Sequence, residues 1–184
     1  MSTTFPGTTI EVSSLQKGSS RRLFDGIFAT GGVTLSQVSI MSGLEPYIIQ
    51  NWVKRGFLSS PVKRLYSKGQ FARIIIINML RESLQLERIC GLISIISGVT
   101  DSEADDLISD EELYHRYIDM LSEKDISVND ERSVLLAAER ATEDFEERFP
   151  NSKKQLIKIL QVMLYAHAAS GLRRSAEDIL CAMK

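Results

Sequence analysis

The chain has 184 residues, of which 43% are hydrophobic and 25% charged, which is typical of a folded globular protein and argues against general disorder or a fibrous repeat. No apolar run approaches the roughly 20 residues that span a bilayer, and the first residues lack the basic start and apolar stretch of a secretory signal. Two cysteines, Cys90 and Cys181, cannot form a disulfide framework or supply four ligands to zinc. We therefore expect a cytoplasmic protein with no membrane contact.

Charge is divided unevenly along the chain. Residues 1–97 carry eleven Lys or Arg and five Asp or Glu, a net +6, whereas residues 98–184 carry eleven and nineteen, a net −8. Opposite halves of this kind suggest a basic module for a polyanion and an acidic module with a separate role. We predict a flexible tail over residues 1–20, a basic helical domain over residues 21–97 and an acidic helical domain over residues 98–184.

Helical patterns dominate, so the predicted fold class is all-α. Four consecutive isoleucines at residues 74–77 favour extended structure by themselves. Ser67 and Gln70, however, have the spacing of a capping box that opens an uninterrupted apolar helix pattern, and this predicts a helix. In the acidic half, N-cap residues predict helix starts at Ser109, Asn129 and Asn151. Gly171 is predicted to end the last of these helices, with a short final helix after it.

The most informative segment is TLSQVSIMSGLEPYIIQNWVKRGFL, residues 34–58, which predicts two short helices joined by a tight turn. Gly43 suits the left-handed backbone of such a turn, and Pro46 suits the first turn of the second helix. The remaining pattern predicts a shared core between the two helices, formed by Leu35, Val38, Ser39, Leu44, Ile49 and Trp52. An ordinary antiparallel helix pair has the same pattern, so spacing alone leaves DNA binding open.

The exposed side of the second helix carries side chains suited to a DNA major groove. Amide side chains bond base edges, and Lys and Arg bind phosphates. Six basic residues against one acidic residue between positions 44 and 73 favour this interpretation over a solvated surface. The predicted contacts are Tyr47, Gln50, Asn51, Lys54 and Arg55 from the helix, with Lys63, Arg64 and Lys68 on neighbouring phosphates.

This segment resembles the N-terminal winged helix-turn-helix domain of the MerR family of bacterial transcription regulators. The likeness covers about residues 33–96. Its matching positions are Thr34-Leu35 and Val38-Ser39 in the opening helix, Gly43-Leu44 in the turn, Gly56-Phe57-Leu58 at the exit, Pro61 at the start of the wing, Arg64-Leu65-Tyr66-Ser67 at its end, and residues 71–92 in the helix pair that follows. The resemblance implies a winged head that binds DNA.

Two departures distinguish the chain from that family. Gln50-Asn51 stands where the family has arginine-tyrosine, and the wing is several residues shorter, lacking a glycine-tyrosine-arginine segment. The shortened form is most similar to a group of uncharacterised bacterial proteins that carry a MerR-like head and a helical C-terminal tail. The implied architecture is a winged head with a short or degenerate wing, followed by a C-terminal helical bundle.

The C-terminal half offers a candidate dimer interface and little support for catalysis. The helix predicted after Asn151 is apolar on most of its circumference, as expected for a domain centre, a homodimer interface or both. His115 and His167 have no companion residues in a catalytic pattern, and the acidic run at residues 101–112 lacks the spacing of a calcium loop. We therefore predict no enzyme activity, cofactor or metal.

The leading hypothesis is a sequence-specific, DNA-binding transcription regulator that forms a homodimer through its C-terminal helices. Two alternatives stay open. A winged scaffold can dock an acidic protein in place of DNA, which would make the chain a protein–protein adaptor. The apolar C-terminal helices can instead enclose a pocket, which would make it a ligand sensor.

Overall fold

The computed structural model describes residues 3–96, 106–123 and 125–183, and this part of the chain is mostly helical. That confirms the predicted all-α class. Short strand pairs join β1 (Thr3–Thr4) to β2 (Glu11–Val12) and β3 (Val33–Thr34) to β4 (Leu65–Tyr66), both antiparallel. The helices are α1 (Ser19–Ile27), α2 (Leu35–Ser42), α3 (Pro46–Lys54), α4 (Lys68–Leu80), α5 (Leu86–Ile96), α6 (Asp110–Leu121), α7 (Glu131–Arg140) and α8 (Ser152–Ala182).

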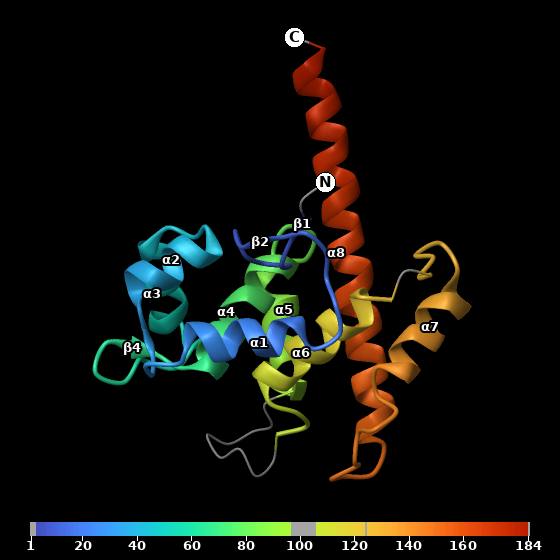
Figure 1. Cartoon of the computed structure of the whole chain (residues 1–184), viewed down its shortest axis with the longest axis horizontal. Helices are drawn as coiled ribbons and strands as arrows, with labels where there is room; N and C mark the ends of the chain where they lie inside the picture. The colour runs from blue at the N-terminus through green and yellow to red at the C-terminus, as the bar shows by residue number, and fades with distance from the viewer. Residues whose placement is uncertain (1–2, 97–105, 124, 184) are drawn as a thin grey trace.

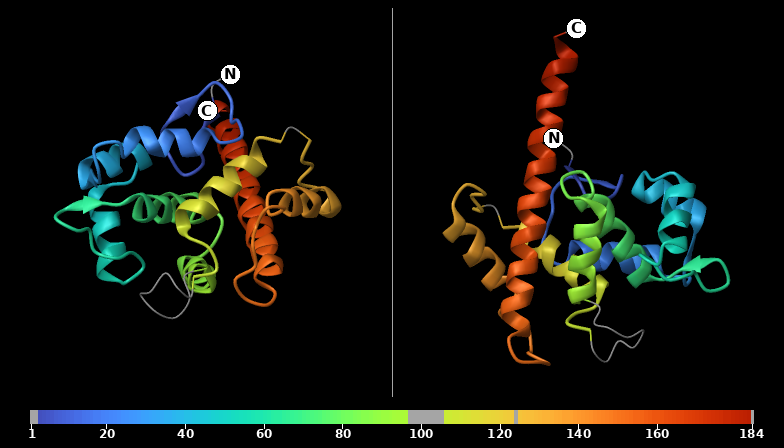
Figure 2. Two further views of the ribbon diagram at one scale, coloured as in Figure 1. Left: turned by 60° about the horizontal axis from the view of Figure 1, so that its bottom comes forward. Right: turned by 180° about the vertical axis from the view of Figure 1, so that it is seen from behind.

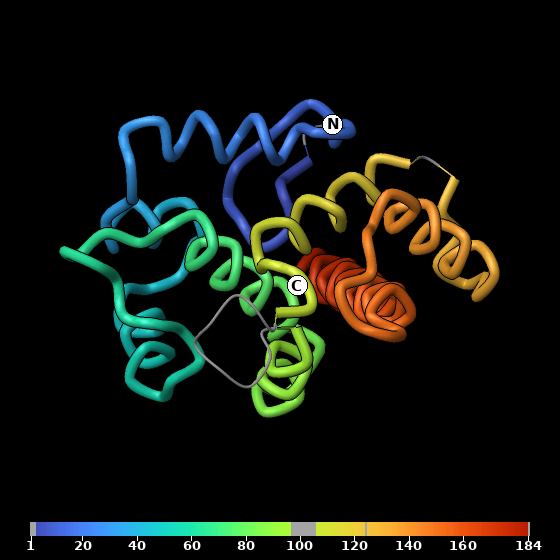
Figure 3. The backbone as a smooth tube through the Cα atoms, turned by 90° about the horizontal axis from the view of Figure 1, so that it is seen from below, coloured from blue at the N-terminus to red at the C-terminus, as the bar shows by residue number. Residues whose placement is uncertain are grey.

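The elements form a body crossed by one long helix (Figure 1). Helices α2 and α3 lie with β4 at one end of the body, and α4 leads from there toward α6 and α8. Helix α7 packs on the other side of α8, as the views in Figure 2 and the view along α8 in Figure 3 show. None of the helices in the described ranges has both the length and the apolar character needed to cross a bilayer.

Helix α4 forms the centre of the core. Its N-cap Ser67 and Gln70 form the predicted capping box, and the four isoleucines at residues 74–77 are all buried. They are buried because α4 packs against α6 on one side and against α2 and α8 elsewhere. One continuous hydrophobic cluster therefore includes residues from both sequence halves, and the predicted boundary between residues 97 and 98 does not separate two cores.

Ion pairs between the two halves explain much of the uneven charge. Arg21 in α1 lies 2.6 Å from Asp119 and 3.1 Å from Glu112 in α6. Arg73 in α4 lies 2.7 Å from Asp110 at the start of α6. The acidic first turn of α6 thus serves as a partner for basic residues of the first half, rather than as a purely solvated surface.

The N-terminal segment differs from the predicted flexible tail. Phe5 is buried in the core, and the carbonyl of Pro6 accepts a 2.9 Å hydrogen bond from the Tyr114 hydroxyl. Gly7 has φ +76°, and a Cβ there would lie 2.1 Å from the carbonyl oxygen of Ile75. Residues 5–7 are therefore packed against α4 and α6. A single buried phenylalanine and a close glycine contact hold them there, although the composition resembles that of a loose tail.

Helix ends follow the predicted caps in part. Ser109 caps α6, as expected, whereas α7 is capped by Asp130, one residue after the predicted Asn129. Gly171 does not end the last helix: α8 continues from Ser152 to Ala182 as one element. A glycine inside a helix costs only about 1 kcal/mol relative to alanine, so its neighbours can continue the helix through it.

Candidate nucleic-acid interface

The turn between α2 and α3 is fixed by hydrogen bonds from small side chains. Gly43 has φ +69°, the left-handed conformation predicted for this position. The Ser39 hydroxyl donates to the Leu44 carbonyl at 2.6 Å, and the Ser42 hydroxyl donates to the Val38 carbonyl at 2.7 Å. The two bonds use the Leu44 carbonyl in the turn and the Val38 carbonyl inside α2, and they connect the end of α2 to the turn that leads into α3.

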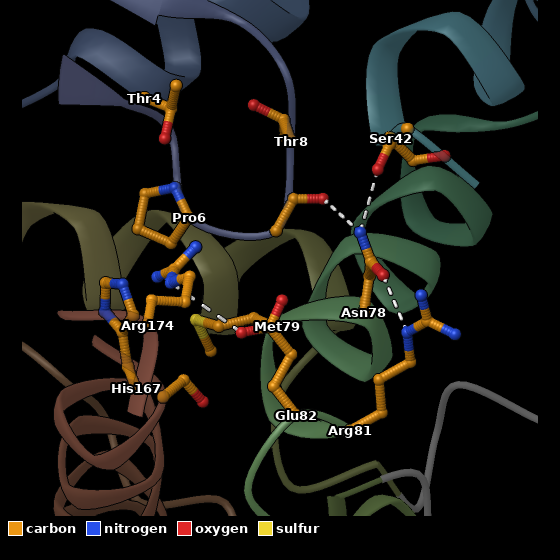
Figure 4. Close-up of a pocket in the computed structure, with 13 residues that line it drawn as sticks. Thr4, Pro6, Thr8, Ser42, Asn78, Met79, Arg81, Glu82, His167 and Arg174 are labelled. Atoms are coloured by element: carbon orange, nitrogen blue, oxygen red, sulfur yellow. Dashed lines mark hydrogen bonds and ion pairs between the residues drawn. The ribbon is translucent and has the colours of Figure 1, made fainter. Parts of the chain in front are cut away.

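The inward face of the helix pair is the one that the sequence predicts. Val38, Leu44, Ile49 and Trp52 are all buried in the main hydrophobic cluster. Asn78 of α4 adds a connection that sequence reasoning missed. Its side-chain amide donates to the carbonyls of Ser42 at 2.8 Å and Gly7 at 3.0 Å (Figure 4). The end of α2 is therefore fastened to both α4 and the N-terminal segment.

The outward face of α3 is open to solvent. Four of its five predicted DNA contacts have exposed side chains that make no hydrogen bond or ion pair with any residue of the described chain; these are Tyr47, Gln50, Asn51 and Lys54. Arg55 differs, because its guanidinium lies 4.5 Å above the Phe57 ring and 3.8 Å from the Glu87 carboxylate. None of the described residues of the C-terminal half covers this face.

A short hairpin, here called the wing (residues 61–66), follows α3. Leu65 N donates to Val62 O at 2.9 Å across a two-residue turn, and the two central residues Lys63 and Arg64 have φ +50° and +66°. Positive φ at both central positions defines a type I′ turn, in which Asn-Gly is the usual pair. Lys and Arg are costly there, so the turn holds two exposed cations in a strained backbone.

The wing and α3 border a common groove whose lining is mostly apolar. A groove of about 360 Å³ lies between them and includes both Gln50 of α3 and Arg64 of the wing in its lining. The Gln70 side-chain amide holds the loop that leads into the wing by donating to the carbonyls of Ser59 and Ser60 at 3.0 and 3.1 Å. Gln70 therefore supports the wing as well as capping α4.

Lys68 is placed differently from the other predicted phosphate contacts. Its ammonium group lies 2.7 Å from the Asp25 carboxylate and 3.9 Å from that of Glu111. Asp25 raises the pKa of Lys68, and Lys68 in turn lowers the pKa of Asp25 through their hydrogen bond. Lys68 therefore joins α4 to α1 and α6, whereas Lys63 and Arg64 form no ion pair within the described residues.

Two further polar sites bear on the predictions for catalysis and ligand binding. A pocket of about 220 Å³ lies between the N-terminal segment, α4 and α8, and is lined by Asn78, Arg81, Glu82, His167 and Arg174 among others (Figure 4). His167 Nδ1 lies 2.8 Å from the Tyr117 hydroxyl, and burial lowers the pKa of this histidine. The pocket is mostly polar and is shared with the first half of the chain, unlike the apolar C-terminal pocket considered from the sequence.

The second histidine is internal. His115 packs edge-on against Phe24, and its Nδ1 lies 2.9 Å from the Ser20 hydroxyl. Burial lowers the pKa of His115 to about 4, and the nearby Arg21 acts in the same direction. Within the described ranges, no group of three His, Cys, Asp or Glu residues is arranged to hold a metal ion.

Comparison with known proteins gives one match. Residues 33–117 match the family model for a domain of unknown function, DUF1836. The matched range begins at β3 and includes α2, α3, the wing, α4, α5 and most of α6. It supports the predicted likeness to an uncharacterised domain family and crosses the predicted boundary at residues 97/98. No curated protein and no solved structure matches the chain.

Proposed function

We propose that the protein is a cytoplasmic, sequence-specific DNA-binding transcription regulator whose helix α3 enters the major groove. The observation that carries the proposal is the arrangement of Gln50, Asn51 and Lys54 on an open helix face, with Arg64 of the wing lining the same groove as Gln50. Amide side chains can read adenine edges bidentately, and the cations can bind the phosphates on either side. In the second sequence half, α8 supplies the contact between two copies.

The backbone of the wing supports this proposal. Strained residues persist where the surrounding structure holds them, and they concentrate at functional sites. Lys63 and Arg64 adopt a turn that glycine would adopt more easily, and both expose their charge. A wing that carries two cations beside α3 suits phosphate binding, as the MerR-like resemblance of residues 33–96 also implies.

The experiment measures fluorescence anisotropy of the full chain against double-stranded fragments selected from genomic DNA. Asn51→Ala removes a base contact and should lower affinity for the selected site by about 1–3 kcal/mol, while leaving binding to unrelated DNA nearly unchanged. Lys54→Ala removes a phosphate contact and should lower both affinities to a similar extent.

The matched control is Lys154→Ala with Lys158→Ala, because both lysines are exposed on α8. This variant loses two positive charges away from α3 and should bind the selected site as the unaltered chain does. If the control and Lys54→Ala lose the same DNA affinity, the loss depends on net charge alone, and the proposed interface is contradicted.

One observation favours protein–protein docking as the second candidate. Tyr47 on α3 and Val62 on the wing expose 68% and 73% of their surface. Large exposed hydrophobic side chains favour contact with another protein, whereas phosphate binding uses polar and charged ones. An adaptor would bind an acidic protein with this surface and show no affinity for DNA at any salt concentration. The anisotropy titration therefore separates the two functions.

A further inference from the structure

The C-terminal part of α8 projects from the body. The helix continues well past the body of the molecule (Figure 1), beyond the turn at which Arg173 and Arg174 lie 3.6 and 3.8 Å from the Glu82 carboxylate. Leu172, Ile179 and Met183 expose 74%, 64% and 78% of their surface there. An isolated helical segment of this length is marginal in water, and large apolar side chains on it favour a partner.

The exposed apolar residues follow a heptad repeat. Spacings of three and four alternate without interruption along one side of α8, and every residue in the series is exposed. This is the 3.5-residue period of a coiled-coil seam. The series, here called the α8 seam, consists of Val162, Tyr165, Ala169, Leu172, Ala176, Ile179 and Met183.

Small and large residues alternate in the central part of the α8 seam, from residue 169 to residue 179, and this pattern determines how the seam can pair with itself. In a parallel pair, Ala169 and Ala176 would each meet their own copies, while Leu172 and Ile179 would do the same. Layers of two alanines would then alternate with layers of two large side chains, and no single distance between the helices packs both.

An antiparallel pair removes this conflict. Ala169 of one copy then meets Ile179 of the other, and Leu172 meets Ala176, so each central layer combines one small and one large residue. Tyr165 meets Met183 at both ends. The paired length from residue 165 to residue 183 is about 27 Å at 1.5 Å per residue. The uniform central layers permit one close helix separation between residues 169 and 179, whereas the two end layers each combine two large residues.

Charge on the edge of the α8 seam matches the same pairing. Arg173 already forms a 2.6 Å ion pair with Glu177 one turn further along its own helix. Arg173 also lies 3.6 Å from Glu82 of its own chain. In the antiparallel register, Glu177 of the second copy lies on the same side of the pair as Arg173 of the first and adds a further carboxylate near the guanidinium. The two-fold symmetry makes the same contact twice, as an isologous interface requires.

We infer that the α8 seam binds a second copy of this chain as an antiparallel two-helix coiled coil. The pairing deepens the homodimer part of the proposed function by naming its surface and its register. A two-fold axis perpendicular to the helices relates the two α3 surfaces, which suits a palindromic DNA site. Its test uses no DNA, so failure of the dimer and failure of DNA binding are measured separately.

Sedimentation equilibrium of the full chain tests the seam. The expected mass is twice the 20.6 kDa of one chain. Leu172→Glu with Ile179→Glu should give a monomer, whereas Ile95→Glu, at an exposed apolar position on α5, should leave the dimer intact. A monomeric unaltered chain, or a dimer that survives the double substitution, would overturn the inference.

Disulfide crosslinking tests the register without disturbing the seam as strongly. Cys90 and Cys181 are first replaced by serine, because both are free. A mixture of Ala176→Cys and Leu172→Cys chains should then form a crosslinked heterodimer on mild oxidation, while Ala176→Cys alone should not crosslink. Efficient crosslinking of Ala176→Cys with itself would show a parallel pair and contradict the antiparallel register.

Discussion

Helices α3 and α4 are neighbours in sequence and both belong to the basic half, yet they use their cations differently. Lys54 on α3 is exposed and forms no ion pair within the described residues, whereas Arg73 and Lys68 on α4 pair with Asp110 and Asp25. One face of α3 is free, while α4 is buried by other elements on most of its sides. Density of positive charge along the sequence therefore does not by itself mark a binding surface.

The pairing partners explain the difference. Helix α6 begins with three acidic residues and packs on α4, so the cations of α4 and α1 that face it are neutralised internally. The wing and α3 lie beyond the reach of α6 at one end of the body (Figure 1). The cations left over after this internal pairing are the ones available to a polyanion.

The largest expected effect is on the stability of the fold and comes from a substitution in the buried helix α4. Ile75→Ala in α4 should lower the free energy of unfolding by about 2–5 kcal/mol, because it leaves a cavity at a fully buried position. Both halves should unfold in the same transition, since they share one core. Chemical denaturation followed by circular dichroism measures this. Ile40→Ala, at an exposed position, is the control and should change stability by less than about 0.5 kcal/mol.

His115, which packs between α1 and α6, makes the free energy of unfolding depend on pH. The pKa of His115 is near 4 in the folded chain and near 6.5 when unfolded, so the unfolded chain binds more protons between these values. The stabilisation is complete above pH 6.5 and is lost as the pH falls toward 4, by about 1–2 kcal/mol between pH 7 and pH 5. His167 acts in the same direction. Denaturation of His115→Gln at both pH values should show a smaller loss; an unchanged loss would contradict this assignment.

Some features of the structure can be predicted from the sequence and others cannot. The paired helices, their turn and the exposed face of α3 follow from local signals such as Gly43, Pro46 and helical periodicity. The helix at residues 74–77 was also predictable, because the capping box at Ser67 outweighs the β preference of isoleucine. Local spacing is sufficient wherever the relevant contacts lie within a few turns.

Long-range contacts were not predictable in this way. Phe5 and Pro6 are held by α4 and α6, about seventy and more than one hundred residues away, so the N-terminal segment looks like a tail in sequence. Lys68 forms an ion pair with Asp25, and no residue close to Lys68 in the sequence predicts this partner. The strained turn at Lys63 and Arg64 could not be predicted from the sequence either, because neither residue type favours positive φ.

A smaller effect concerns the strain in the wing. Arg64→Gly should raise the free energy of unfolding by about 0.5–1 kcal/mol, because the relief of a left-handed residue, about 1–2 kcal/mol, exceeds the added freedom of glycine in the unfolded chain. The same change should weaken DNA binding through the lost cation. Thermal unfolding and anisotropy on one protein preparation measure both. Lower stability would show that the turn is not strained as described.

The smallest expected effect on DNA affinity comes from the paired lysine. Lys68→Ala should change affinity for DNA by less than about twofold, because its ammonium group is already engaged with Asp25 and is not offered to phosphate. Lys63→Ala removes the same side chain from the open wing and should have a clearly larger effect. A Lys68→Ala loss as large as that of Lys63→Ala would remove the distinction between the two sets of cations.

The salt dependence of DNA binding tests the distinction between the two sets most directly. Anisotropy titrations of the full chain over a range of salt concentrations give a log–log slope of about −0.9 per neutralised phosphate. Replacing both Lys63 and Arg64 by alanine should reduce the magnitude of that slope by about two units, whereas Lys68→Ala should leave it unchanged. A slope insensitive to the double substitution, or DNA binding absent at low salt, would contradict the proposal that α3 and the wing form a nucleic-acid interface.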